Sequence, residues 1–318
     1  SILGSAVAQI AVMSRVMVPE MAKQGYSRDF AAATTAAGGL LSPVIPPSML
    51  FIIFGVIAQV SIGDMFLAGI LPGVLMLGGF VLAVRWLGRT HDYPRAEALS
   101  QAQRRRYLVE GLPAAAIPGV ILGSVLFGIA TPTEAAALAA LVAVVLGRWY
   151  YRELGWAQAW RAVVQAGMSA SVILFIIATA GLFGWVLIFE QLPQQLAAAL
   201  VALTADPFVF MLLVNAALLL IGMVIDGIPA MIMVAPILLP IAIGVYGIDP
   251  FHFGVIICIN LVLGLLTPPV GTGLYVASAA AGVSPGRVFV AVLPFLATTA
   301  VVLGLVSWQP WLATAFVR

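Results

Sequence analysis

The chain has 318 residues, of which 63% are hydrophobic and only 8% are charged. Soluble domains carry roughly a quarter charged residues, and a water-soluble fold of this length cannot hide so much apolar surface. These numbers exclude a soluble enzyme, a disordered tail and a nucleic-acid-binding protein. They leave an all-α polytopic membrane protein, whose apolar surface is covered by lipid.

Apolar stretches long enough to cross a bilayer recur along the chain. A shorter apolar helix is expected before them, at 5–22. The segment 207–245 is expected to form a re-entrant hairpin, because the run Asp226-Gly-Ile-Pro229 divides it into two arms whose outer ends lie on the same side. The predicted spans are 29–60, 65–87, 112–130, 135–150, 165–189, 251–282 and 288–307.

Two polar connectors separate these segments. Residues 88–110 are predicted to form a basic cytoplasmic loop with an amphipathic helix, and 190–206 an amphipathic helix on the outer surface. Thr131-Pro-Thr-Glu134 is typical of a capping box with proline at the first helical position. We expect two histidines to be solvated at the interfaces and two tryptophans to form an interfacial belt; these are His91, His252, Trp308 and Trp311.

Basic residues are unevenly distributed along the chain. Between residues 162 and 286 there is no lysine or arginine, although this stretch contains several turns. Short loops rich in these residues stay in the cytoplasm, so all basic clusters should share one face and the other turns the opposite face. The clusters are Lys23 with Arg28; Arg85, Arg89, Arg95 and Arg104 to Arg106; Arg148, Arg152 and Arg161; and Arg287.

Two parts of the chain resemble each other at a separation of 222 residues. Pro46-Pro47 matches Pro268-Pro269, and GLLSPVIPPS at 39–48 resembles GLLTPPVGTG at 264–273. The turn at Gly25 is basic whereas its counterpart at Gly247 is not, so the two copies should have opposite orientations. Inverted repeats with broken helices are the architecture of secondary transporters. Since the second copy begins near residue 112, the first is expected to begin before Ser1, and the chain is expected to be N-terminally truncated.

The broken helices supply the chemistry expected of the site. Proline removes an N–H donor, so the runs Ser42 to Ser48 and Thr267 to Gly273 leave carbonyl oxygens free for an alkali cation. The helix N-termini that follow suit an anion. A kink repaired by neighbouring helices is the alternative explanation for each run alone. Asp226 is predicted either to bind a cation or substrate, since intramembrane carboxylates are costly, or to cap the returning helix.

Several motifs together resemble one known family. They are SILGSAVAQ (1–9), VMVPEMAKQGYS (16–27), GGLLSPVIPPS (38–48), SIGDMFLAGILPG (61–73), GIATPTEAAALAAL (128–141) and NLVLGLLTPPVGTGLYVAS (260–278). In this order they are similar to the large membrane subunit of tripartite ATP-independent periplasmic (TRAP) transporters, over essentially the whole chain. The resemblance implies an inner-membrane transporter of bacteria or archaea that imports a small organic acid with sodium by an elevator movement. It also implies two partners, a small membrane subunit and a periplasmic substrate-binding protein, and no cofactor apart from the coupling sodium ions.

The resemblance further implies the residues of the site. Substrate would lie between the two hairpin tips, near Ser5, Ser48 and Asp226, with Gln9 on the same helix. Gln9, like Leu3 and Ala6, departs from the SISGSSVAD common in the family. Arg15 would either pair with a substrate carboxylate or face the basic side. The first sodium site would involve Ser1, Ser42, Ile45 and Pro47, and the second Gly222, Ile225, Gly264 and Thr267.

From these features we predict a transport region, 1–60 and 207–283, that carries the hairpins and broken helices. The scaffold is predicted at 61–206, including the 88–110 loop, and at 284–318. Three other functions remain open: a passive anion channel, a stand-alone sodium/carboxylate symporter and a structural membrane scaffold. No nucleophile–base pair, phosphate loop or metal cluster occurs in the sequence, so an enzyme is not expected.

Overall fold

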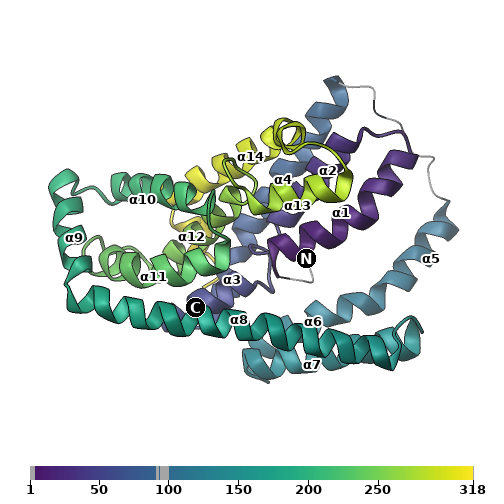
Figure 1. The fold of residues 1–318 in the computed structure, drawn as a ribbon, viewed down its shortest axis with the longest axis horizontal. Coiled ribbons are helices and arrows are strands. Elements are labelled where there is room, and N and C mark those ends of the chain that lie inside the picture. The colour runs from purple at the N-terminus through teal and green to yellow at the C-terminus, as the bar shows by residue number, and fades with distance from the viewer. Residues whose placement is uncertain (1–3, 91–92, 94–99, 318) are drawn as a thin grey trace. The chain divides into compact units, whose positions relative to one another are not determined.

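The computed structural model describes residues 4–90, 93 and 100–317, and all regular elements in this part of the chain are helices (Figure 1). The described residues fall into two compact units. The larger contains 4–90, Tyr93 and 179–317, and the smaller contains 100–178. The predicted all-α fold is confirmed.

The larger unit contains α1 (Ala6–Lys23), α2 (Arg28–Leu40), α3 (Met49–Ala58), α4 (Ile62–Thr90), α9 (Leu192–Leu203), α10 (Pro207–Gly222), α11 (Gly227–Gly244), α12 (Pro250–Gly264), α13 (Thr272–Ala281), α14 (Pro285–Trp308) and α15 (Trp311–Thr314). The smaller unit contains α5 (Gln101–Gly111), α6 (Ala116–Leu126), α7 (Pro132–Val145) and a π-turn at Leu146–Tyr150. The long helix α8 (Trp156–Phe189) runs from the smaller unit into the larger one.

Six helical runs of the described chain are long and apolar enough to cross a membrane. Five of them overlap the predicted spans 65–87, 112–130, 135–150, 165–189 and 288–307, and the sixth, Gly227–Gly244, is an arm of the predicted hairpin. Each of the two other predicted spans is divided into two shorter helices, α2 with α3 and α12 with α13. These findings are those of a multi-pass helical membrane protein.

The predicted hairpin is formed by α10 and α11. Asp206 caps the start of α10, and its Oδ1 accepts hydrogen bonds from the amides of Phe208 and Val209. The outer ends of the two arms meet, because the Tyr246 hydroxyl after α11 donates to the carbonyl of Thr204 before α10 at 3.0 Å. The Tyr246 ring also stacks on Phe210, with centroids 4.1 Å apart. The start of α10 therefore lies beside the end of α11, as a hairpin requires.

Helices at the two ends of the chain recur in the same order and pack in matching pairs. The starts of α1 to α4 are followed 221, 222, 223 and 223 residues later by the starts of α11 to α14. In the larger unit α1 packs on α13 while α11 packs on α3, and α2 packs on α14 while α12 packs on α4. Figure 1 shows α1 and α13 side by side.

Helix α12 lies in the centre of the larger unit. Every residue from His252 to Gly264 is buried. Its polar group Asn260 donates from Nδ2 to the backbone and side-chain oxygens of Asn215 in α10, both at 2.9 Å. Asn215 in turn donates to the Ser307 hydroxyl of α14 at 2.9 Å. This buried network joins three helices, since each hydrogen bond made away from water stabilises their contact.

The prediction that His252 is solvated is wrong, because its side chain is buried. Its Nε2 lies 2.7 Å from the carbonyl oxygen of Val306 in α14. In a helix this carbonyl accepts from the amide four residues later, but that residue is Pro310, which has no N–H. His252 supplies the missing donor, so Nε2 carries the proton. His91 lies outside the described residues. Trp308 and Trp311 are exposed, and their place in an interfacial belt stays a prediction.

We expect the variant His252→Leu to unfold at a lower temperature than the original protein. The leucine side chain fills much of the space but leaves the Val306 carbonyl without a donor, which costs about 1–3 kcal/mol. The midpoint of thermal unfolding of the purified protein in detergent measures this loss. His252→Gln retains an N–H donor and should recover part of it; equal midpoints for the leucine variant and the original protein would contradict this role.

The predicted loop 88–110 is shorter than expected. Helix α4 continues to Thr90, and from Gln101 the chain is helical into α6 through a 3₁₀ turn at Leu112–Ala115. Helix α5 is present, but it is not amphipathic: its apolar residues Tyr107 to Val109 are consecutive and point in different directions, and all its side chains are exposed. The capping box is confirmed, with Glu134 accepting from the Thr131 amide at 2.8 Å and Thr131 from the Glu134 amide.

Candidate functional site

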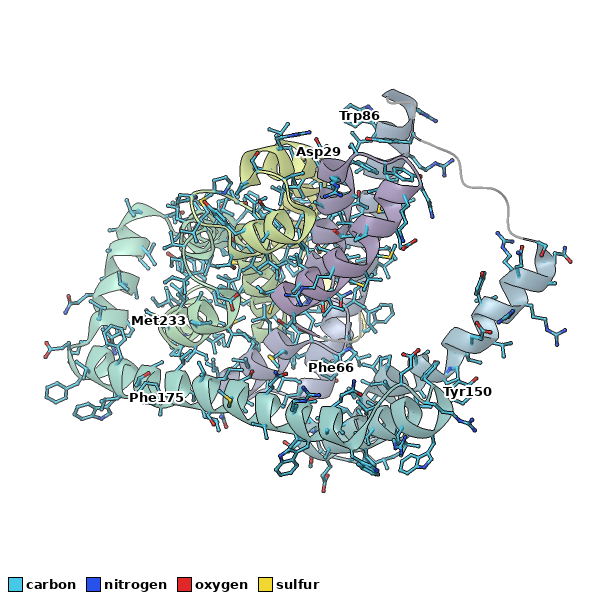
Figure 2. All side chains as sticks on the ribbon, turned by 45° about the vertical axis from the view of Figure 1, so that its right-hand side comes forward. Asp29, Phe66, Trp86, Tyr150, Phe175 and Met233 are labelled. Carbon is cyan, nitrogen blue, oxygen red and sulfur yellow. The ribbon has the colours of Figure 1, made fainter. Side chains whose placement is uncertain are left out.

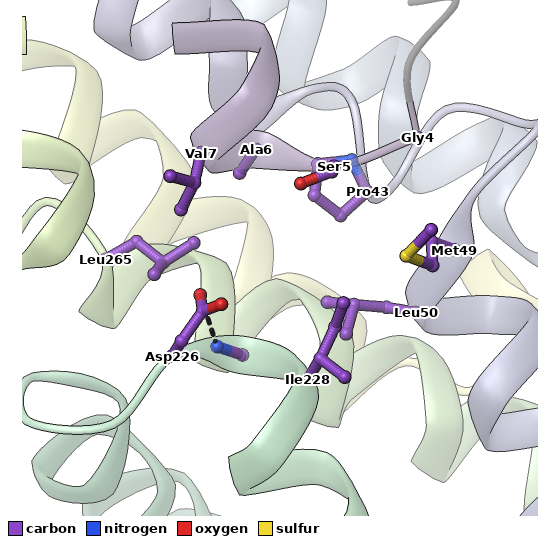
Figure 3. Close-up of a pocket in the computed structure, with 11 residues that line it drawn as sticks. Gly4, Ser5, Ala6, Val7, Pro43, Met49, Leu50, Asp226, Ile228 and Leu265 are labelled. Atoms are coloured by element: carbon purple, nitrogen blue, oxygen red, sulfur yellow. Dashed lines mark hydrogen bonds between the residues drawn. The ribbon is translucent and has the colours of Figure 1, made fainter. Parts of the chain in front are cut away.

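A small cavity lies where three helices of the larger unit begin (Figure 3). Its walls include the first residues of α1, of α3 and of α11. The first turn of a helix has amide groups without intrahelical partners and a partial positive charge. These three helix starts therefore place partial positive charge at the wall of the cavity. Its lining residues are Gly4, Ser5, Ala6, Val7, Pro43, Met49, Leu50, Asp226, Gly227, Ile228 and Leu265.

One carboxylate also borders this cavity, that of Asp226. It is the N-cap residue of α11, and its Oδ1 accepts a hydrogen bond from the Gly227 amide at 2.8 Å. Figure 3 shows its carboxylate directed into the cavity. Asp226 therefore caps the helix, which is one of the two roles predicted for it, and also lines the cavity. Its binding of a cation or substrate stays a prediction.

The tip before α1 is fixed against the break between α2 and α3. The carbonyl of Gly4 accepts from the amide of Met49, the first residue of α3, at 3.2 Å. Gly4 has φ +64°, and a Cβ there would lie 3.1 Å from both Met49 N and Pro47 O, so glycine is required for this approach. Ser48 caps α3 by accepting from the Phe51 amide at 3.2 Å, and it donates to the Pro43 carbonyl.

The tip between α10 and α11 meets the second break in a similar way. The carbonyl of Met223 accepts from the amides of Val270 and Gly271, at 3.2 and 3.0 Å. Beside this contact the backbones of Gly222 and Gly264 touch, since a Cβ on Gly264 would lie 2.4 to 2.8 Å from atoms of Gly222. The Thr267 hydroxyl donates to the carbonyl of Leu263 at 2.8 Å.

The structure brings some of the predicted site residues together. Ser5 and Asp226 line one cavity, and Gly222, Ile225, Gly264 and Thr267 all belong to the second tip and break. Ser42, Ile45 and Pro47 belong to the first break; Ser1 lies outside the described residues.

Other residues have positions that differ from the prediction. The buried Ser48 hydroxyl is engaged in the helix cap and does not line the cavity, nor does Gln9, which is one turn beyond Ser5. Arg15 is exposed and lines no part of it. Gly4 and Gly227 line the cavity and belong to the two expected hairpin tips. Met49 also lines it and was not predicted; its position directly after the first break was the available signal.

Comparison with known proteins gives the family of the chain. Residues 1–312 match the family model "Tripartite ATP-independent periplasmic transporter, DctM component". The chain belongs to this DctM family. It is thus a transporter permease component and not an enzyme.

Several curated relatives of this family are similar to the chain. The isethionate TRAP transporter permease protein DctMQ of Oleidesulfovibrio alaskensis is 35% identical over 311 residues, 98% of this chain and 49% of that protein. The 2,3-diketo-L-gulonate TRAP transporter large permease protein YiaN of Escherichia coli is 36% identical over 281 residues, 88% of this chain and 66% of that protein. The C4-dicarboxylate TRAP transporter large permease protein DctM of Pseudomonas aeruginosa is 34% identical over 313 residues, which are 98% of this chain and 73% of that protein. The chain thus spans between about half and three quarters of these relatives.

Proposed function

We propose that this DctM-family chain is the large permease subunit for sodium-coupled import of a small organic acid. One observation carries the proposal: three helix N-termini and one carboxylate border the same cavity. Pro43 and Leu265, which belong to the two breaks, line it as well. The N-termini favour a carboxylate ligand. The negative charge of Asp226 repels a carboxylate unless a cation is bound nearby. Such a cavity suits an anion that enters together with sodium.

The relatives support an organic anion as substrate. Their names specify isethionate, 2,3-diketo-L-gulonate and C4-dicarboxylates, which differ in structure but are all small acids. Backbone amides would bind the carboxylate of the substrate, and only a few side chains would contact the rest of the molecule.

The sodium ions are proposed to bind where each hairpin tip meets a break. Carbonyl and hydroxyl oxygens of Ser42, Ile45 and Pro47 belong to the first of these places, and those of Gly222, Ile225, Gly264 and Thr267 to the second. The residues present fit a hard monovalent cation, because they offer neutral oxygens rather than imidazole or thiolate groups.

An inverted repeat and an elevator movement are part of the proposal. The near-constant spacing of helix starts and the reciprocal packing of α1 on α13 and α11 on α3 support two copies of one unit. In this mechanism the hairpins and broken helices move together relative to the scaffold. A site where two copies meet near the membrane midplane is typical of secondary transporters.

We also propose the assembly and its place in the cell. The large permease would act in the inner membrane of a bacterium or archaeon with a small membrane subunit and a periplasmic substrate-binding protein. The description of the family as a tripartite periplasmic transporter supports an assembly of three components. The binding protein would deliver the acid to the outer side of the cavity.

Uptake into proteoliposomes containing all three components tests the function. We expect accumulation of the acid held by the cognate binding protein when sodium is higher outside, and background uptake when the gradient is replaced by potassium. Accumulation without sodium, or driven by ATP alone, would contradict sodium coupling. Flux down the substrate gradient that ignores sodium and needs no binding protein would indicate the anion channel instead.

A further inference from the structure

An apolar groove of about 620 Å³ lies on the larger unit, away from the cavity described above. Helices α2 and α4 form its walls, and both pack on α14, whose Phe295 also lines the groove. Phe295 makes an edge-to-face contact with Phe80 of α4, with ring centroids 5.6 Å apart. The walls contain Ala37 and Gly38 from α2 and Leu41 directly after it, so the groove suits a hydrocarbon chain.

One end of the groove carries a positive charge. The lining residues of α4 run from Leu77 to Arg85, roughly 12 Å along the helix. Arg85 is exposed and makes no ion pair within the described residues. A long arginine side chain lines apolar surface with its stem while its guanidinium reaches a polar layer. Arg85 therefore marks the end of the groove that meets the lipid headgroups.

The same three helices continue beyond Arg85 into a polar layer. A second cavity of about 720 Å³ is lined there by Asp29, Leu87, Tyr93 and Pro294, among others. Asp29 accepts an ion-paired hydrogen bond from Arg287 of α14 at 3.1 Å. Figure 2 shows Asp29 and Trp86 at the same end of the unit.

This polar end faces the cytoplasmic side if short basic turns remain inside. Arg28 donates to the Ala281 carbonyl at 3.3 Å and Arg287 to Asp29, so basic turns from distant parts of the chain meet at this end. The cytoplasmic leaflet contains anionic lipids, which are attracted to such clusters. The apolar walls of the groove and the basic residues at its end thus both favour an anionic lipid as the occupant.

We propose that the groove binds one acyl chain of an anionic phospholipid of the cytoplasmic leaflet, with its phosphate held by Arg85. Gly38 keeps the groove open, because a Cβ at this position has no atom within 4 Å. A larger side chain at Gly38 fills the groove without displacing protein atoms. The lipid separates α2 from α4, and its binding does not depend on the transport function proposed above.

Lipid titration of the delipidated full permease chain, read by native mass spectrometry, tests the proposal. We expect phosphatidylglycerol to bind about fivefold more tightly than phosphatidylcholine, because one arginine near an anionic headgroup contributes about that factor to the affinity. Arg85→Gln should remove this preference, and Gly38→Leu should weaken both lipids at the groove. The matched controls Arg89→Gln and Gly78→Leu lie on α4 outside the groove and should bind like the original protein.

Each other outcome counts against the proposal. Equal affinity of the original protein for the two lipids, or an unchanged preference in Arg85→Gln, would overturn the role of the headgroup. Unchanged binding in Gly38→Leu would show that the chain does not occupy this groove. Size-exclusion profiles in detergent establish that all four variants are folded, so that lost binding is not lost structure.

Discussion

Gly264→Ala is expected to lower both the stability and the transport activity of the protein. The new Cβ would lie 2.4 Å from the carbonyl carbon of Gly222, and backbone atoms cannot move aside as a flexible side chain does. Forcing an extra methyl group into a packed interior costs about 1–3 kcal/mol. The second hairpin tip must shift from the break in α12–α13, and with it the oxygens proposed to bind sodium.

The midpoint of thermal unfolding and the rate of sodium-driven uptake measure these two effects. Gly304→Ala is the matched control, because a Cβ at Gly304 in α14 has no atom within 4 Å. The control should be at least as stable as the original protein, since alanine favours a helix over glycine. A Gly264→Ala protein with unchanged midpoint would mean that the two backbones do not need to touch.

Asp226→Asn is expected to reduce sodium-dependent uptake by about ten- to a hundredfold, because interactions with a charged group are worth about 1.5–3 kcal/mol. Asparagine caps helices about as well as aspartate, so α11 should keep its start and the protein its stability. The substitution thus removes the charge at the cavity and retains the cap.

Asp226→Ala completes the comparison, because it removes the cap as well. It should lower the free energy of unfolding by about 1 kcal/mol, and the unfolding midpoint with it. Uptake by proteoliposomes and thermal unfolding of all three proteins give the two readouts. If the asparagine variant transports normally while the alanine variant is unstable, Asp226 is a structural cap and the proposed coupling loses its carboxylate.

The breaks and the hairpin could be predicted because proline and glycine act locally. Pro268 and Pro269 remove two amide donors wherever the rest of the chain lies, and α12 ends at Gly264, shortly before the predicted break at Thr267 to Gly273. Asp226-Gly227 similarly marks the hairpin tip. Such features depend on a few neighbouring residues, which a sequence displays directly.

Residues whose partners are distant in sequence could not be placed. Pro310 indicates that the Val306 carbonyl needs a donor, but the sequence does not identify His252, 54 positions earlier, as its source. Likewise no local signal pairs Gly222 with Gly264. Ser48 is a different case, since a serine directly before an apolar helix is typical of an N-cap, and the ligand role assigned from resemblance left this local role out.

The central position of α12 has a consequence for how this membrane protein tolerates change. A helix that faces lipid accepts most apolar side chains, because fluid acyl chains adapt to any shape. Positions 252–264 have protein on all sides instead, and close-packed interiors respond to a single methylene group. A hydropathy profile gives both kinds of helix the same high value, so it hides the segment of this chain in which size and shape, rather than polarity, limit substitution.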